Sequence, residues 1–160
     1  MTRSDELREA YGLTPHPEGG AFAEVYASAA QTEGRGCAGS IYFLLSGAEI
    51  SHLHEIDCEE VWYYHEGCGL KLTLVDGAGN VETALLGGDL RRGQRHMLVV
   101  PRGVWFASEN IDKDGYTLVS CATAPRFRYE GFRLIGRAEL AARCGDGAQD
   151  LQYLIREEEA

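Results

Sequence analysis

The sequence is organised as a series of short apolar segments separated by turns. The segments recur about every ten residues, and no helical pattern lies between them. Twenty glycines against only four prolines supply residues suited to tight turns. The rhythm predicts an all-β fold, which could be a sandwich, a jelly roll or a barrel. The candidate strands are 22–28, 41–45, 60–65, 70–75, 81–86, 97–100, 104–108 and 116–123.

Helical composition is confined to the two ends of the sequence. Residues 4–11 predict a short helix, which Ser4 could cap. Beyond Gly136, residues 137–143 and 151–159 have the composition of two further short helices. No internal repeat, linker or low-complexity tract interrupts the chain, so we expect one domain over residues 1–160.

Charge and composition argue against several classes of partner. A formal net charge of −10 would repel a phosphate backbone, so no nucleic-acid partner is expected. No apolar run approaches the roughly 20 residues that a membrane helix needs. The N-terminal residues lack an apolar signal segment. We therefore expect a cytoplasmic protein with no membrane partner. The five cysteines are an odd number without a C-x-x-C pair, which argues against a disulfide framework and a zinc ribbon.

The residues best suited to chemistry are two histidines, His52 and His54, and a nearby carboxylate. Residues i and i+2 of a strand point to the same face, so the two imidazoles are expected to converge. Two imidazoles and a carboxylate form half a metal site or an acid–base site. Cys58 and Glu59 are alternatives to Glu60 as the third group of this site. Glu60 is preferred because it would share a strand face with aromatic residues at 62 and 64.

Three segments carry a family resemblance. The pattern G-x4-H-x-H-x5-E-x6-G, from Gly47 to Gly67, resembles the first motif of the cupin superfamily, and residues 93–106 resemble the second. The opening PHPEGGAFAEVYAS, residues 15–28, resembles the narrower and uncharacterised cupin-5 family. The resemblance implies a double-stranded β-helix, the cupin jelly-roll barrel. It also implies a homodimer and a pocket that opens at one end of the barrel.

The resemblance also implies roles for individual residues. His52, His54 and Glu60 would bind a divalent metal such as Fe, Mn, Ni or Zn. The fourth ligand position of metal-dependent cupins holds Phe106 here instead of histidine. Met97 stands where family members often have glutamine, so both positions make the pocket more apolar. The expected pocket-lining residues are His16, Glu18, Phe22, Glu24, Tyr26, Trp62, Met97, Trp105 and Phe106.

Three functions remain open at this point. The first is binding of a small polar metabolite in the barrel pocket, with an optional metal and with His52, His54, Glu60 and Tyr64 as the candidate catalytic residues. The second is a metal-free isomerase that acts on a sugar nucleotide, because the G-G-x-F-x-E segment is similar to one in the dehydrorhamnose 3,5-epimerases. His52 or His54 would then be the base, and Tyr26 or Tyr64 the acid. The third is a non-catalytic sensor or structural dimer.

Overall fold

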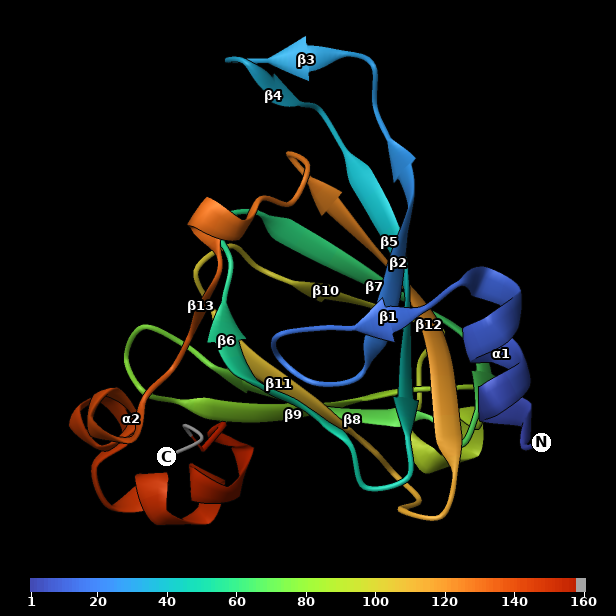
Figure 1. Ribbon diagram of the computed structural model, residues 1–160. Helices are drawn as coiled ribbons and strands as arrows, with labels where there is room; N and C mark the ends of the chain where they lie inside the picture. The colour runs from blue at the N-terminus through green and yellow to red at the C-terminus, as the bar shows by residue number, and fades with distance from the viewer. Residues whose placement is uncertain (158–160) are drawn as a thin grey trace.

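A computed structural model describes residues 1–157, in which two antiparallel sheets pack face to face as a jelly roll (Figure 1). Most consecutive strands from β5 onward lie in different sheets, so the chain passes repeatedly from one sheet to the other, as in a jelly roll. The six-stranded sheet has the order β1 (Thr14–Pro15), β2 (Ala21–Ala27), β5 (Gly39–Ser46), β12 (Tyr116–Ala124), β7 (Glu59–Gly67) and β10 (Met97–Val100). The five-stranded sheet has the order β13 (Arg133–Leu134), β6 (Ile50–Glu55), β11 (Trp105–Asn110), β8 (Leu70–Val75) and β9 (Val81–Leu86).

The main core lies between the two sheets and follows from alternation along their strands. Phe43, Trp62 and Phe106 are its largest members, and each is almost fully buried. Leu70 and Leu72 of β8 fill the remaining space with the same period of two. Burial of such side chains contributes roughly 1.5–3 kcal/mol each, so the strands are held chiefly by this shared interior.

A second apolar cluster covers the outer face of the five-stranded sheet. It is formed with helix α2 (Arg137–Cys144) and the 3₁₀ helix η3 (Gly145–Leu154). The predicted helix over 137–143 is confirmed. The helix predicted over 151–159 is confirmed only at residues 151–154, which end a 3₁₀ helix that begins at Gly145, and it is wrong at residues 155–157. Ala148, Leu151 and Leu154 are buried at a spacing of three, which is the period of a 3₁₀ helix. The helix ends at Leu154, and residues 158–159 lie outside the described residues.

The N-terminal helix α1 (Arg3–Tyr11) begins slightly earlier than the sequence suggested. Thr2, not Ser4, is its N-cap, and Thr2 exchanges hydrogen bonds with Asp5 in a capping box. Leu7 anchors the helix against the six-stranded sheet. Within residues 1–157, no helix is both long and apolar enough to cross a membrane. Two short 3₁₀ turns complete the helical elements, η1 (Leu90–Arg92) and η2 (Tyr129–Gly131).

Strands β2, β6 and β7 each contain an extra residue that reverses the direction of the side chains beyond it. In β7, Tyr64 and Glu66 are two steps apart but pair with adjacent residues of β12. Phe106 pairs with His54 but Ser108 pairs with Ser51, so two steps along β11 match three along β6. In β2, two steps match a single step along β5, between Glu24 and Tyr26. Such β-bulges disrupt the alternation of faces on which the sequence argument relied.

A hairpin formed by β3 (Gln31–Thr32) and β4 (Arg35–Gly36) projects beyond the two sheets, as Figure 1 shows at the top of the molecule. Its strands continue β2 and β5 upward. One side chain of the hairpin contacts the sheets. The guanidinium of Arg35 donates two hydrogen bonds to the carboxylate of Asp57.

The loop between β1 and β2 depends on two glycines. Gly19 and Gly20 have positive φ values of 109° and 74°, which other residues adopt only with strain. A Cβ atom at Gly19 would also overlap the carbonyl oxygen of Ile50. The loop can therefore lie directly against β6 only with glycine at position 19.

We predict that Gly19→Ala lowers the free energy of unfolding by more than about 3 kcal/mol, because strain and overlap act together. Gly34→Ala is the matched control, since Gly34 also has positive φ (74°) but has open space around its Cα. The control should cost only about 1–2 kcal/mol. Urea unfolding measures both, and equal losses would contradict the close approach of the loop to β6.

Candidate functional site

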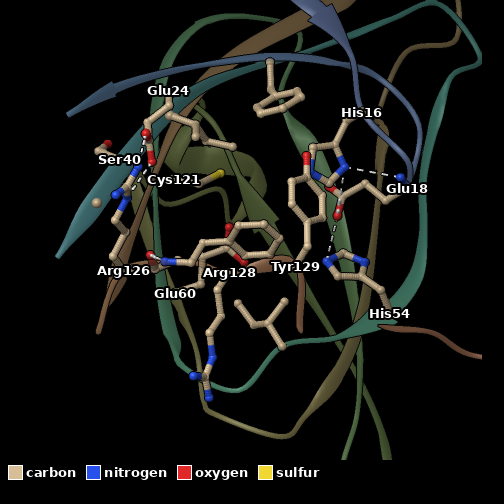
Figure 2. A pocket seen from close by; sticks show the side chains of 16 residues that line it. His16, Glu18, Glu24, Ser40, His54, Glu60, Cys121, Arg126, Arg128 and Tyr129 are labelled. Atoms are coloured by element: carbon tan, nitrogen blue, oxygen red, sulfur yellow. Dashed lines mark hydrogen bonds and ion pairs between the residues drawn. The ribbon is translucent and has the colours of Figure 1, made fainter. Parts of the chain in front are cut away.

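A pocket of about 270 Å³ opens between the two sheets at the end of the molecule that carries the hairpin (Figure 2). Its inner wall combines acidic groups and histidines with apolar side chains, and arginines stand at its entrance. The lining residues are His16, Glu18, Phe22, Glu24, Gly39, Ser40, Ile41, His54, Ile56, Glu60, Cys121, Thr123, Arg126, Phe127, Arg128 and Tyr129.

The Glu18 carboxylate is the best-connected group in the pocket. It comes from the β1–β2 loop and is buried against β6. One oxygen accepts a hydrogen bond from the Ser51 hydroxyl at 2.8 Å. The other lies 3.0 Å from Nε2 of His54. Burial alone would raise the pKa of Glu18, but the charge of His54 and these hydrogen bonds hold that pKa below its ordinary value. Glu18 is therefore ionised at neutral pH.

His54 completes an ion pair with Glu18. Its Nδ1 lies 2.6 Å from the carbonyl oxygen of His52, which can only accept, so Nδ1 carries a hydrogen. Burial would lower the pKa of His54, but the Glu18 carboxylate and the hydrogen bonds raise it above its ordinary value. Each ring nitrogen faces an oxygen acceptor, the His52 carbonyl or the Glu18 carboxylate, and this arrangement favours the imidazolium form of His54.

His52 positions the Glu18 loop instead of lining the pocket. Its backbone N–H donates to the Glu18 carbonyl at 2.8 Å, and its Nδ1 lies 2.7 Å from the same oxygen. The expectation that both imidazoles face one pocket is wrong, because the β6 bulge places His52 on the outer face, beside Arg137 and Gln152.

Glu60 is the second buried carboxylate and stands on the opposite sheet. It is only 8% exposed and pairs across the strands with Thr123 of β12. Burial raises its pKa to about 7, and the nearby negative charge of Glu18 adds to the effect. The two buried carboxylates of the pocket therefore differ in protonation at neutral pH, because Glu18 has a charged partner and Glu60 is left with only partial compensation.

His16 lies among aromatic rings near Glu18. The ring of Phe22 is 4.6 Å away edge-on, and Tyr129 and Phe132 lie within 6.4 Å. Its Nδ1 accepts the backbone N–H of Glu18 at 3.2 Å, which requires that nitrogen to be unprotonated. Burial lowers the pKa of His16, so the ring is neutral with its hydrogen on Nε2.

Arginines surround the entrance. They come from the segment that follows β12. Nε and Nη2 of Arg126 donate to the Glu24 carboxylate, the first at 3.0 Å. Arg128 donates through the same two nitrogens to Asp57, at 3.1 and 2.9 Å. Asp57 also accepts hydrogen bonds from Arg35. The two guanidinium groups hold the pKa of Asp57 below its usual range despite its partial burial.

Six of the predicted pocket residues do line the cavity, namely His16, Glu18, Phe22, Glu24, His54 and Glu60. The rival residues at 58 and 59 do not: Cys58 is in the core, where burial raises its thiol pKa to about 11, and Glu59 is exposed. Cys121 and Thr123 alternate along β12 into the same space.

The other predicted lining residues lie elsewhere. Tyr26 follows the β2 bulge and is 54% exposed, and Met97 faces outward beside Tyr63 at 50% exposure. The Tyr64 hydroxyl donates to the Gly67 carbonyl, away from this pocket.

The three remaining residues that were predicted to line the pocket are aromatic, and they pack in the apolar clusters. Trp62 and Phe106 fill the main core, although the Phe106 ring packs 4.1 Å from that of His54. Trp105 lies on the outer face, where Glu55 accepts its indole N–H and the Arg143 guanidinium lies 3.2 Å from its ring centroid. The prediction that these three line the pocket is therefore wrong.

The entrance segment Arg126–Phe127–Arg128–Tyr129 was missed. It follows the last predicted strand, where no regular element was expected. The alternation of arginine with aromatic residues after Pro125 was the available signal.

The donor set does not fit the metal site that the sequence suggested. That site needs His52, His54 and Glu60 on one face, but His52 is turned away and His54 is engaged through both nitrogens. Within residues 1–157, no group of three histidine, cysteine, aspartate or glutamate side chains is arranged to hold a metal ion.

Several solved structures share the fold of this chain. A protein from Shewanella oneidensis is 34% identical, with a TM-score of 0.92 over 99% of this chain and 100% of the other. A hypothetical protein from Leishmania major is 30% identical, with a TM-score of 0.88 over 98% and 100% of the two chains. Oxalate decarboxylase from Bacillus subtilis shares the fold at 16% identity and a TM-score of 0.59, over 90% of this chain and 37% of that one.

Comparison with curated protein sequences gave no match. The family model described as "Cupin superfamily (DUF985)", Cupin_5, matches residues 5–135, which is most of the chain. The histidine and glutamate of the first cupin motif that reach the pocket, and the loop that carries Glu18, all fall within this range. The chain therefore belongs to the Cupin_5 family of the cupin superfamily.

Proposed function

We propose that the pocket binds a small polar metabolite and transfers a proton to or from it, with Glu60 as the general base and acid. The observation that supports this most directly is a buried carboxyl group, facing the cavity, whose pKa is raised to about 7. A group with this pKa is half protonated at neutral pH and can both take and return a proton.

The remaining polar groups have supporting roles in this proposal. Burial and the negative charge of Glu18 keep the pKa of Glu60 high, and the positive charge of His54 opposes them only in part. His16 is a neutral imidazole whose Nε2–H can donate a hydrogen bond to the substrate. Glu60 takes a proton from the substrate as a carboxylate and returns one as a carboxylic acid. The net reaction is an isomerisation that needs no oxidant, and no step is routed through a metal.

The sugar-nucleotide isomerase is a narrower form of the same proposal. Its predicted acids, Tyr26 and Tyr64, do not line the pocket, whereas Tyr129 does. Ligand cavities for drug-sized molecules usually measure about 300–1,000 Å³. A cavity of about 270 Å³ favours a small metabolite, because only the sugar of a sugar nucleotide would enter it.

The outer face of β7 and β10 supports a second proposal, that two copies of the chain associate there. Tyr63, Met97 and Val99 are 41–51% exposed and adjacent by strand register. The formal net charge of −10 makes copies of the chain repel one another, so an uncharged apolar face is the surface best suited to contact between them.

The pH dependence of stability should reveal Glu60. Between about pH 4.5 and 7 the folded protein holds a proton at Glu60 that the unfolded chain has lost, so the free energy of unfolding falls as pH rises across this window. The fall due to Glu60 is roughly 3 kcal/mol at most. The raised pKa of His54 acts in the same direction, so Glu60→Gln is needed to isolate the contribution of Glu60.

Urea unfolding from pH 4 to 8 measures the difference, and the Glu60→Gln variant should lose less stability at the alkaline end. Carboxyl ¹³C NMR gives a direct titration, with the Glu60 signal assigned by its absence in the variant. A midpoint near the ordinary 4.5 would contradict the proposed role of this residue.

Proton transfer itself is tested in D₂O with a panel of small 2-hydroxy acids, 2-oxo acids and ketose phosphates. We expect deuterium to enter one carbon position of at least one compound, measured by ¹H NMR. Glu60→Gln should slow exchange by about 100-fold or more. Glu59→Gln is the matched control, because Glu59 is the neighbouring and exposed carboxylate. No exchange by the unaltered protein across the panel would favour a non-catalytic sensor.

Association through β7 and β10 is tested by light scattering after size-exclusion chromatography. The unaltered protein should have twice the mass of the 17.6 kDa chain. Met97→Glu should reduce the mass to that of one chain, because it places a charge in the apolar face. Leu90→Glu, at an equally exposed apolar residue on η1, should leave the mass unchanged. A single-chain mass for the unaltered protein would refute the association.

A further inference from the structure

We propose that the metabolite carries a carboxylate or phosphate group, and that Arg126 and Arg128 bind this anionic group at the entrance of the pocket. The inference rests on the proposed function, since it names the class of molecule that the same pocket accepts. It is carried by the hydrogen bonding of the two arginines, by the charge at the entrance and by the separation of charge along the pocket.

Each of the two guanidinium groups is held in position and still has a donor to offer. Arg126 is fixed by Glu24, and Arg128 by Asp57, in both cases through Nε and Nη2. The Nη1 group of each makes no hydrogen bond to any residue in the described range 1–157. Their side chains are 42% and 54% exposed, so an incoming anion can reach them. Guanidinium groups suit carboxylate and phosphate because several donors lie in one plane.

The entrance has more positive than negative charge. Within residues 1–157, Arg35, Arg126 and Arg128 make their ion pairs with two carboxylates, those of Glu24 and Asp57. Arg35 is 15% exposed and directs Nε to the carbonyl of Arg126 and both terminal nitrogens to Asp57. Asp57 is therefore shared, and it cannot neutralise Arg128 fully. On a chain with a net charge of −10, this local excess attracts an anion to the pocket.

Charge is arranged oppositely in the interior. The charge of ionised Glu18 is offset by its partner His54, so the interior becomes negative when Glu60 loses its proton and acts as a base. An anionic group would be repelled from this end and attracted to the entrance. The substrate is thus oriented with its anionic group outward and its uncharged, reacting end beside Glu60. Phe127, between the two arginines in sequence, contributes an apolar wall to the cavity.

Isothermal titration calorimetry with defined probes tests the inference. The anionic probes are L-malate, 3-phosphoglycerate and inorganic phosphate, and the uncharged comparators are malamide and glycerol. At least one anionic probe should bind, and its uncharged comparator should bind at least tenfold more weakly. Tighter binding of L-malate would identify a carboxylate as the anionic group, and tighter binding of the other two would identify a phosphate. Equal binding of charged and uncharged probes, or no binding of any anion, would overturn the inference.

Variants locate the binding site. Arg126→Ala and Arg128→Ala should each weaken binding of the anion about tenfold, because each removes a charged hydrogen bond. Arg92→Ala is the matched control. It removes the same charge from an arginine that is 79% exposed on η1, outside the pocket, and should leave affinity within twofold. Arg126→Lys and Arg128→Lys keep the charge without the planar donors, and they replace any alanine variant whose melting shows that it is unfolded. Unchanged affinity in the folded variants at both positions would overturn the inference.

The two proposals fail in different ways. Arginine-dependent binding of an anion without deuterium exchange would retain the entrance site and reject proton transfer. Exchange into an uncharged compound that is unaffected by the arginine variants would retain Glu60 as the base and reject the entrance site.

Discussion

The burial of the Glu18 carboxylate is the constraint on which the pocket depends. An ionised carboxylate away from water is costly unless charged partners and hydrogen bonds compensate for it. The compensation here comes from two residues of one strand, Ser51 and His54, which the β6 bulge separates by three positions and still directs to the same side. The loop that carries Glu18 is in turn held against β6 by His52 and by the absence of a side chain at Gly19.

A fixed charge at Glu18 determines the behaviour of its neighbour. Glu60 lies in the same enclosed space without a dedicated cation, so burial and repulsion both favour its protonated form. The nearby thiol of Cys121 experiences the same field, and burial raises its pKa well above the ordinary value. The pocket therefore keeps Cys121 in the unreactive thiol form, whereas the raised pKa of about 7 lets Glu60 change charge near neutral pH.

Much of the fold could be predicted from the sequence, because the apolar runs alternate with turns and the motifs match a known family. The pocket was predicted in part for the same reason, since the loop 15–20 and Glu60 belong to those motifs. His52 and Tyr26 were misplaced because a β-bulge adds one residue to a strand, and no residue type marks its position. Met97 was misplaced because the resemblance to the family, whose members often have glutamine at this position, assigned it to the pocket side of β10. The entrance arginines were missed because they follow β12, the last strand that was predicted, in a segment whose path depends on tertiary contacts with Asp57 and Glu24.

The contact between Arg35 and Asp57 links the projecting hairpin to the entrance of the pocket. Arg35 belongs to β4 in the projecting hairpin (Figure 1). Its guanidinium nevertheless donates to Asp57 among the entrance charges. If the hairpin moved away from the sheets, Arg35 would leave the entrance. Arg126 and Arg128 would then each have one carboxylate, Glu24 and Asp57, and the excess of positive charge would be lost. A molecule that bound the tip of the hairpin and moved it would therefore weaken anion binding at the entrance without contacting the cavity.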